Sequence, residues 1–489
     1  MNSVEQTLES LHATATGIFR DALDGCSIES AFDRRLRFDG DTLVRLLPEG
    51  GGPATVNLKD YRRIFVIAMG KAAIPMIDVL MARMNRRAGL RGICCSNAIP
   101  EKRNWRIRYF EGGHPLPNEG SFAAARAALA LLRRAHKDTL VIFLISGGSS
   151  ALFDLPLDPD ISLEDTIVFH QALIASGAPI TEVNTIRKHF SAVKGGRLAL
   201  AAAEAPKLSI LLPDVPLRSL DALASGPTSP DHTTVEQVRA LLAKYDLLAK
   251  FPPSVKTFFE QADLPESPGN KSRLPAFLPP LLQSLPWADN HAITVRKTIA
   301  AALKSEQEAF RDSMFEVLLS SHDLVENARA RALELGYFTV VDNSCDDWDY
   351  EEASRHLMKH FHSVRAEHPR CCLISGGEVT VTLDRLPGAG GRNQQFALAS
   401  AISLAGHPNE ALVVFSAGSD GIDGNTRSAG AIADTSTVRR AVAFGYDPKE
   451  ALAAFNACPL FTALGDTVVT GPTGHNLRDL RLLMAEPLV

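Results

Sequence analysis

Short runs of continuously apolar residues, each followed by a small flexible loop, alternate along the chain with amphipathic segments. The run Val141–Ile145 ends abruptly at Ser146, and the loop Gly147–Ser150 follows. The run Cys371–Ile374 leads in the same way into Ser375–Glu378. Continuously apolar runs of this length are typical of strands that are buried on both faces of a sheet. Because open α/β sheets bind ligands at the carboxyl ends of their strands, both loops are candidate ligand sites.

Strand and helix patterns alternate throughout the first half of the chain. Apolar runs predict strands at residues 64–69, 92–95, 106–110, 141–146 and 208–212. Apolar residues spaced by three or four predict helices at residues 4–24, 74–84, 121–135 and 162–176, and another that starts at residue 184. Ser162 and Asp165 have the spacing of a helix-capping pair. The alternation predicts an α/β fold with a Rossmann-like, doubly wound, mainly parallel sheet.

A change of composition separates this part from a second block. Prolines crowd between Phe251 and Pro286, and the alanine- and charge-rich segment 295–315 resembles an exposed helix. Further strands are expected at residues 315–319, 337–341, 371–374, 411–415 and 466–470, with helices at residues 323–335 and 396–405. A chain of 489 residues is long enough for two domains. We expect an N-terminal domain over residues 1–262, a Pro-rich linker with an inserted helix over 263–313, and a smaller α/β domain over 314–489.

Composition narrows the class of protein without identifying it. Hydrophobic residues make up 45% of the chain and charged residues 22%, which is ordinary for a soluble globular protein. The net charge of −5 does not favour nucleic-acid binding, and no apolar run reaches the roughly 18 residues of a membrane span. The polar segment Met1–Gln6 does not resemble a secretory signal. The seven cysteines show no Cys-x-x-Cys spacing, so we expect buried thiols in a reducing cytoplasm.

Loops rich in glycine, serine and threonine recur at five strand ends and indicate a phosphate-bearing ligand, because backbone N–H groups in such loops bind anions. Known phosphate motifs do not match. The first glycine of a P-loop is Phe65 here, and Asn393 replaces the last glycine of a dinucleotide fingerprint that starts at Gly388. Gly147–Ala151 nearly matches the nucleophile elbow of serine hydrolases, but Ala151 replaces its final glycine. A serine hydrolase therefore stays open as an alternative.

Charged residues in or beside these loops are the candidate catalytic groups. Lys71 follows the glycine turn after the first strand, and Arg392 lies in a glycine-rich loop, where its planar guanidinium suits a phosphate or a carboxylate. Asp214 and Asp420 follow strands, where a carboxylate can hold Mg²⁺ or accept a hydroxyl proton. Asp423 is equally consistent with a turn residue.

Jointly, the motifs resemble those of the class II glycerate 2-kinases, whose C-terminal part is the MOFRL domain. The matching segments keep the family's order over most of the chain: Met69–Ala73, Gly113–Pro117, Ile145–Leu152, Asn184–His189, Lys194–Arg197, Ala224–Thr228, Ile374–Glu378, Gly390–Gln394, Ser416–Gly424 and Thr470–Gly474. The resemblance implies ATP-dependent phosphorylation of D-glycerate to 2-phosphoglycerate, in a cleft between a Rossmann-like domain and a smaller α/β domain. A kinase of a related hydroxy acid and a hydroxypyruvate reductase are the alternatives.

The resemblance also implies a set of site residues, with ATP and Mg²⁺ as the expected cofactors. Lys71, Arg392, Asp214 and Asp420 are expected to be catalytic, and the two aspartates are the candidate metal ligands. Substrate and phosphates are expected at Ser146, Gly147, Gly148, Ser149, Ser150, Ser375, Gly376, Gly377, Glu378 and Asn393. The chain departs from the family pattern after Asp214, where Leu217-Arg218 replace a Gly-Asp. Glycerate and ATP are the expected partners of a cytoplasmic monomer or homodimer that binds neither nucleic acid nor membrane.

Overall fold

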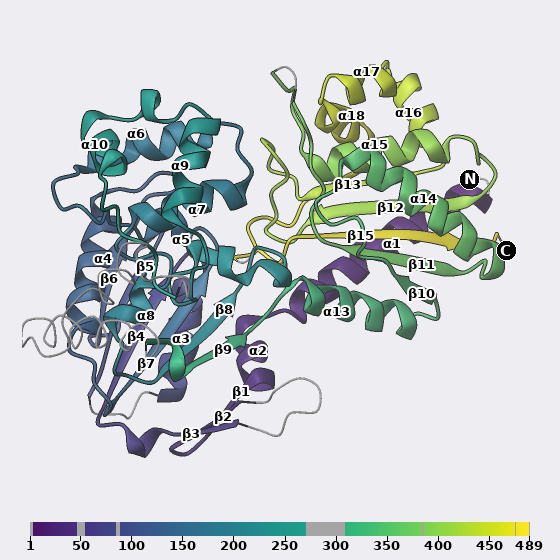
Figure 1. The fold of residues 1–489 in the computed structure, drawn as a ribbon. Helices are drawn as coiled ribbons and strands as arrows, with labels where there is room; N and C mark the ends of the chain where they lie inside the picture. Colours follow the sequence, from purple (N-terminus) through teal and green to yellow (C-terminus); the bar gives the residue numbers. More distant parts are fainter. Residues whose placement is uncertain are drawn as a thin grey trace, which may run out of the picture. The chain divides into compact units, whose positions relative to one another are not determined.

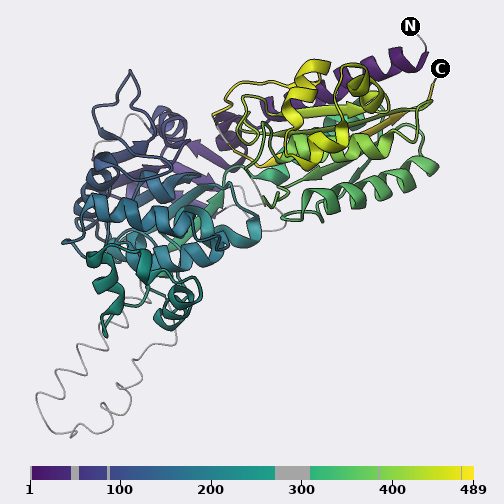
Figure 2. The same ribbon diagram turned by 90° about the horizontal axis from the view of Figure 1, so that it is seen from above.

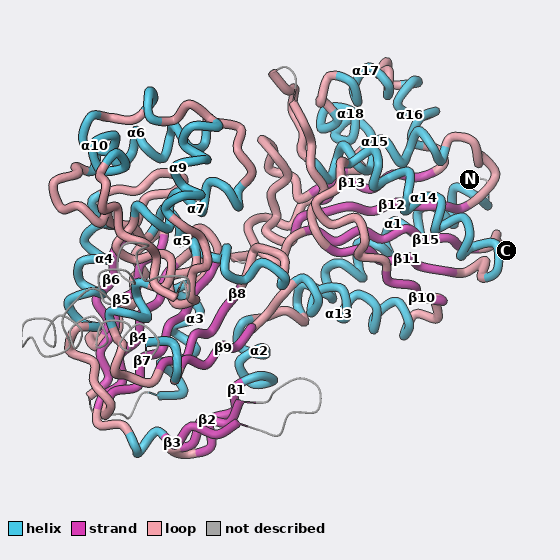
Figure 3. The backbone as a smooth tube through the Cα atoms, in the orientation of Figure 1, coloured by secondary structure: helices cyan, strands magenta, loops and turns pink. Residues whose placement is uncertain are grey.

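The chain forms two compact units. A computed structural model describes residues 3–45, 54–84, 89–269, 309–383, 386–474 and 476–488. One unit comprises Phe32–Leu318, and the other comprises Met1–Ala31 together with Leu319–Val489. Each unit is built around a six-stranded sheet (Figures 1 and 3). No helix among the described residues combines the length and the apolar character needed to cross a bilayer.

Six parallel strands form the sheet of the Phe32–Leu318 unit, in the order β6-β5-β4-β7-β8-β9. They are β4 (Arg63–Met69), β5 (Leu90–Ser96), β6 (Ile107–Glu111), β7 (Thr139–Ser146), β8 (Lys207–Leu212) and β9 (Ser313–Val317). In chain order this is 3-2-1-4-5-6, the order of the Rossmann fold, and the direction of winding reverses between β4 and β7. The predicted doubly wound parallel sheet is confirmed for this unit.

Helices cover both faces of this sheet. α4 (Glu119–Leu132) and α8 (Arg197–Ala201) pack on the face that carries Phe65, Ile67 and Met69 of β4. α3 (Ala73–Met84) packs against β4, β5 and β7. Every residue of β7 is buried, as a strand covered on both faces requires. A separate antiparallel sheet of the same unit contains β1 (Leu36–Asp39), β2 (Thr42–Arg45) and β3 (Ala54–Asn57).

Four helices enclose a second apolar cluster of this unit: α6 (Leu163–Ile174), α7 (Ile180–Phe190), α9 (Val235–Lys244) and α10 (Pro253–Glu260). Phenylalanine rings fill the cluster, and the centroids of Phe169 and Phe190 lie 4.1 Å apart. Ser162 caps α6 by accepting the N–H of Asp165, as the sequence predicts. The proline-rich composition that begins at Phe251 does not mark the end of this unit, because Phe251 and the apolar face of α10 belong to this cluster.

The sheet of the other unit is mixed, with the order β10-β11-β15-β12-β13-β14. Its strands are β10 (Phe338–Val341), β11 (Cys371–Gly376), β15 (Asp479–Glu486), β12 (Ala411–Gly418), β13 (Gly430–Asp434) and β14 (Thr467–Val468). Only β10 and β11 are parallel neighbours. The strand predicted at residues 466–470 is the two-residue β14, whereas β15, which the sequence pattern did not indicate, lies at the centre of the sheet.

Helices also cover both faces of the mixed sheet (Figures 1 and 2). α14 (Tyr350–Glu367) and α15 (Arg392–Leu404) pack with Leu412 and Val414 of β12. On the opposite face lie α1 (Ser3–Asp24) and α13 (Ser321–Glu334), where the rings of Phe19 and Phe415 are 5.0 Å apart. The predicted division placed residues 1–262 in one domain. By its contacts α1 instead belongs to the unit of the mixed sheet, because its apolar stripe packs on β12 and α13.

One predicted strand belongs to a different sheet than expected. The segment 315–319 was expected to start the second domain, but it corresponds to β9, which pairs with β8 and completes the parallel sheet. The expected helix at residues 295–315 lies largely outside the described residues, as does most of the 263–313 linker. The chain therefore leaves the parallel sheet only after Leu318.

A charged cluster that the sequence pattern did not indicate lies inside the Phe32–Leu318 unit. Asp154 is fully buried and accepts hydrogen bonds from His170 Nε2 at 2.7 Å and Ser191 Oγ at 2.7 Å. The Nζ atom of Lys194, itself buried, lies 2.6 Å from the same carboxylate. Burial alone would raise the pKa of Asp154, but the charge of Lys194 and the hydrogen bond from His170 hold that pKa well below its usual range. The cluster joins the segment after α5 (Ser149–Leu152), α6, and the segment between α7 and α8.

We expect the substitution Asp154→Ala to lower the free energy of unfolding by about 3–5 kcal/mol, because Lys194 then stays buried without its carboxylate. Urea unfolding followed by circular dichroism measures the change. The double variant Asp154→Leu/Lys194→Met should recover most of the loss, since a buried pair can be exchanged for apolar side chains. Lys256→Ala, which removes a half-exposed partner of Glu260, is the control. Equal unfolding midpoints for Asp154→Ala and the unmodified protein would contradict the prediction.

Candidate functional site

The loops after β4 and β7 interlock where the winding of the parallel sheet reverses. Ser146 Oγ donates to the carbonyl of Met69 at 3.2 Å and accepts the N–H of Ala72 at 3.1 Å. The N–H of Lys71 donates to the carbonyl of Gly147 at 2.9 Å. Gly70 has a φ of +109°, and a Cβ atom at this position would collide with Ser146. Glycine is therefore required at the turn that presents Lys71.

The predicted residues Lys71, Gly147, Gly148 and Asp214 come together at this edge of the sheet. A Cβ atom on Gly147 would overlap the carboxylate of Asp214, so that carboxylate rests directly on the glycine backbone. A Cβ atom on Gly148 would lie 3.1 Å from Lys71 Cγ and 3.3 Å from His114 Cδ2. Lys71 is exposed, and no described residue forms an ion pair with its ammonium group. Burial and the nearby charge of Lys71 lower the pKa of His114.

The segment from Gly147 to Ser150 presents hydrogen-bond donors at the same place. Within the part of the chain that the structure describes, the N–H groups of its four residues donate no hydrogen bond. Ser149 Oγ donates to the carbonyl of Ser146 at 2.6 Å, and Ser150 Oγ lies 3.1 Å from Ser225 Oγ. Neither serine hydrogen-bonds a described histidine, so the arrangement of a serine hydrolase is not present among these residues. An anion is the ligand that four unengaged N–H groups and an exposed lysine favour.

Arg392, at the start of α15, is held by two carboxylates of its own unit. Its Nε donates to Asp479 Oδ2 at 2.6 Å, while its Nη2 donates to Asp479 Oδ1 at 3.0 Å and to Glu378 Oε1 at 2.7 Å. Burial alone would lower the pKa of Arg392, but the charges of Asp479 and Glu378 raise it, so the group stays charged. Its Nη1 donates to no described residue and remains for a ligand.

The carboxylate of Asp423 caps the same end of α15. It accepts the N–H groups of Asn393 at 3.0 Å and Gln394 at 2.9 Å, and Ser416 Oγ donates to Asn393 Oδ1 at 2.6 Å. Asp423 is almost fully buried, and this burial raises its pKa to about 7. The residue that the sequence left as a possible turn residue thus orients the loop of Arg392.

The loop after β11 is built into the same network. Gly376 N–H donates to Asn343 Oδ1 at 2.8 Å, and Glu378 N–H donates to Asp346 Oδ1 at 3.1 Å. Ser375 is fully buried, and its Oγ has no hydrogen-bond partner among the described residues. A Cβ atom on Gly377 would lie 2.6 Å from Asp346 Oδ1, so this glycine too permits a close approach of a carboxylate.

The predicted residues therefore form one group in each unit. Asp420 belongs to the second group, because both its carboxylate and that of Asp479 lie within 3.3 Å of a Cβ built on Gly418. Sequence reasoning missed Asp479, Arg478 and Arg481, all on or next to the central strand β15. Arg478 donates to Asp346 at 2.7 Å, and buried Arg481 donates to the carbonyl of Gly377 at 3.1 Å. Charged residues inside an apolar strand were the signal that could have found them.

The described residues offer only a partial ligand set for the expected Mg²⁺. No three His, Cys, Asp or Glu side chains of the described segments are grouped so that they could hold a metal ion by themselves. This fits Mg²⁺ in phosphoryl-transfer enzymes, where one or two carboxylates and the phosphates of the substrate usually hold the ion. Asp214 and Asp420 are candidates for such a partial ligand set.

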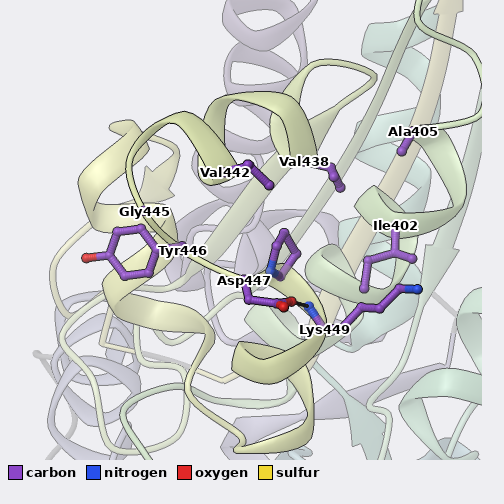
Figure 4. Close-up of a pocket in the computed structure, with 9 residues that line it drawn as sticks. Ile402, Ala405, Val438, Val442, Gly445, Tyr446, Asp447 and Lys449 are labelled. Atoms are coloured by element: carbon purple, nitrogen blue, oxygen red, sulfur yellow. Dashed lines mark hydrogen bonds between the residues drawn. The ribbon is translucent and has the colours of Figure 1, made fainter.

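A pocket on the outside of the mixed-sheet unit is not part of either group. It has a volume of about 600 Å³ and is lined by residues of α15, α16 (Thr437–Ala443) and the start of α17 (Pro448–Ala453), among them Ile402, Val438 and Val442 (Figure 4). Its lining contains no predicted site residue. A hollow with a mainly apolar lining, whose one lysine, Lys449, is accompanied by the carboxylate of Asp447, does not suit a phosphorylated ligand.

A Rossmann-ordered sheet whose switch-point loops carry unengaged N–H groups and a lysine defines an α/β enzyme that acts on a phosphate-bearing ligand. Two family models match the chain, the domain of unknown function DUF4147 over residues 14–260 and the MOFRL family over residues 371–479. The glycerate 2-kinase of Pyrococcus horikoshii is 33% identical over 86% of this chain and 86% of its own. The D-glycerate 2-kinase of Thermotoga maritima is 31% identical over 90% of this chain and 94% of its own.

Solved structures agree with these matches. The crystal structure of the glycerate kinase from Thermotoga maritima covers 98% of this chain and 100% of its own, with a TM-score of 0.76 and 29% identity. The chain belongs to the glycerate 2-kinase family.

Asp423 provides a test of the second group of residues. Its raised pKa means that between about pH 4 and pH 7 the folded protein keeps a proton that the unfolded chain, with an ordinary aspartate pKa, has released. The free energy of unfolding should therefore fall as pH rises through this range, by up to about 1.4 kcal/mol per pH unit. Urea unfolding at pH 5, 6, 7 and 8 measures the slope.

The variant Asp423→Asn should lose this contribution and show a flatter profile between pH 5 and pH 7. Asp447→Asn, which changes an exposed carboxylate of the same unit, should keep the slope of the unmodified protein. Parallel profiles for the unmodified protein and Asp423→Asn would show that Asp423 is ionised throughout.

Proposed function

We propose that this protein transfers the γ-phosphoryl group of ATP to the 2-hydroxyl group of D-glycerate and releases 2-phospho-D-glycerate. The observation that carries the proposal is the set of N–H groups at Gly147–Ser150, beside the exposed ammonium group of Lys71, none of which has a partner among the described residues. Glycerate carries a carboxylate and ATP carries a triphosphate, so both substrates need such donors. Membership of the glycerate 2-kinase family supports the choice of substrate.

Phosphoryl transfer asks a protein mainly to position its substrates and to offset negative charge. Lys71 is the group that we assign to charge on the transferring phosphoryl group, because no carboxylate in the described segments pairs with it. Asp214 lies at the same loops and is our candidate for orienting the 2-hydroxyl group and accepting its proton. The N–H groups of Gly147–Ser150 then bind substrate oxygens.

The other unit carries a candidate anion-binding group of its own. Arg392 is oriented by Asp479 and Glu378, and its remaining Nη1 is the donor that we assign to a phosphate or carboxylate oxygen. The buried Ser375 Oγ and the N–H of Gly377 belong to the loop that we assign to the same role. Mg²⁺, when bound with ATP, neutralises charge on the phosphates, and Asp214 or Asp420 would hold it.

A coupled ADP-release assay over small hydroxy acids tests the activity. D-glycerate should be turned over only with ATP, and L-glycerate and lactate should be poor substrates. Phosphorus NMR of the product should show coupling to the proton on C2, which distinguishes 2-phosphoglycerate from 3-phosphoglycerate. ADP release that does not depend on D-glycerate, or a product phosphorylated at C3, would overturn the proposal. Oxidation of NADH or NADPH with hydroxypyruvate would instead favour a reductase.

The substitution Lys71→Met should reduce kcat/KM for D-glycerate by about 10²–10³, as the loss of one preorganised charge does at comparable sites. The effect should fall mainly on kcat, since the charge of the phosphoryl group develops in the transition state. Steady-state kinetics with both substrates varied measures the split. Lys137→Met removes another exposed lysine of the same unit and should leave the kinetics unchanged. Turnover of Lys71→Met near that of the unmodified protein would refute the role of this residue.

We also propose a cytoplasmic location and a monomeric or homodimeric state. All seven cysteines have free thiols, and burial raises the pKa of Cys371 to about 11, so this thiol stays protonated and unreactive. Light scattering coupled to size-exclusion chromatography measures the oligomeric state.

A further inference from the structure

A pocket of about 570 Å³ lies around the amino ends of β4, β5 and β6. Its lining includes Arg63 at the start of β4, Arg91 at the start of β5, and Arg106 and Arg108 at the start of β6. The candidate catalytic loops leave the carboxyl ends of the same parallel sheet. Because the seven residues of β4 rise about 3.3 Å each, the two ends are about 20 Å apart. The pocket is therefore separate from the site of Lys71.

The charged residues that line this pocket are all positive. Five of its lining residues are arginines, and none is acidic: Arg63, Arg91, Arg106, Arg108 and Arg134. Arg63 Nη2 donates to Asp138 Oδ1 at 3.4 Å, but the buried Arg63 Nε has no hydrogen-bond partner among the described residues. A chain with a net charge of −5 thus gathers five guanidinium groups around one hollow. A concave site lined by one sign of charge concentrates counter-ions, here anions.

An aromatic ring holds two of these groups in place. Trp105 is 76% exposed, and the guanidinium carbons of Arg106 and Arg91 lie 4.8 Å and 5.4 Å from the centroid of its ring. Such cation–π contacts are worth about 0.5–1 kcal/mol each at an exposed site. They restrict the guanidinium groups before any ligand binds, which lowers the entropy that binding has to overcome. Trp105 is therefore also a built-in reporter of occupancy.

We propose that this arginine pocket binds a small phosphorylated molecule with at least two phosphate groups. Arginine forms paired hydrogen bonds with phosphate oxygens, and five guanidinium groups exceed what a single phosphate can engage. The volume lies within the range of about 300–1,000 Å³ that is typical of small-molecule sites. Nucleoside polyphosphates and sugar bisphosphates share this chemistry, and the experiment below distinguishes the two sources.

Titration with tripolyphosphate at constant ionic strength, followed by tryptophan fluorescence, tests the proposal. The unmodified protein should show a saturable change, and Trp105→Phe should abolish that change while calorimetry still detects binding. Arg91→Gln/Arg108→Gln should weaken binding at least about tenfold, since two charge-assisted contacts are lost. Arg133→Gln changes an exposed arginine next to Arg134 that is not in the lining, and its affinity should stay within about twofold.

The same titration with ADP and with a sugar bisphosphate then identifies the source of the phosphates. Tighter binding of either one than of tripolyphosphate, with the same dependence on Arg91 and Arg108, supports the pocket and names its ligand class. Equal affinity in the double variant and in Arg133→Gln, or a signal that survives Trp105→Phe, would overturn the proposal. The double variant and Arg133→Gln are also measured in the Lys71→Met background. Because the readout is binding at Trp105, its failure is distinct from a failure of the proposed kinase activity.

Discussion

The hydroxyl group of Ser146 joins the two central strands of the parallel sheet at the point where their winding reverses. It donates to Met69 at the end of β4 and accepts from Ala72 just beyond the turn. The glycine at position 70 leaves the space that this contact needs. Once the two loops are locked together, the backbone of Gly147 faces Asp214 and the side chain of Lys71 lies over Gly148. That interlock positions Lys71 and the loop after β7 whose N–H groups we assign to substrate oxygens.

In the other unit, ion pairs and hydrogen bonds to carboxylates orient the candidate site residues. Arg392 is gripped by Asp479 and Glu378, and the loop that carries it is oriented by Asp423, whose carboxylate accepts two N–H groups at the start of α15. Helix N-termini favour a negative charge, which offsets part of the cost of burying Asp423. The raised pKa of this residue shows that burial still outweighs those contacts. Asp423 thus orients the start of α15 at a cost in electrostatic free energy.

Sequence patterns predicted most of the parallel sheet because its strands are continuous apolar runs and its helices have clear periodicity. They failed where partners are distant in the chain. β9 pairs with β8 across about a hundred residues, and no local pattern could place it in that sheet. β15 was missed because Arg481 and Asp479 interrupt its apolar character, although both are fully buried in paired positions. Motif resemblance pointed to Lys71 and Arg392 as candidates, but only three-dimensional contact reveals that Arg392 already has two carboxylate partners.

Three cationic side chains differ in burial and in ion pairing, and this difference bears on which of them can take part in a reaction. Lys194 is fully buried against Asp154, and giving up that partner would cost several kcal/mol, so its role is structural. Arg392 is one-third exposed and paired on one side, which allows it to orient a ligand without being released. Lys71 is exposed and has no carboxylate among the described residues. A lysine that is not ion-paired breaks no contact when a phosphate binds, so its whole charge is available to stabilise the transition state. A paired lysine must first exchange its carboxylate for the phosphate. That asymmetry is the physical reason for placing the transferring phosphoryl group at Lys71.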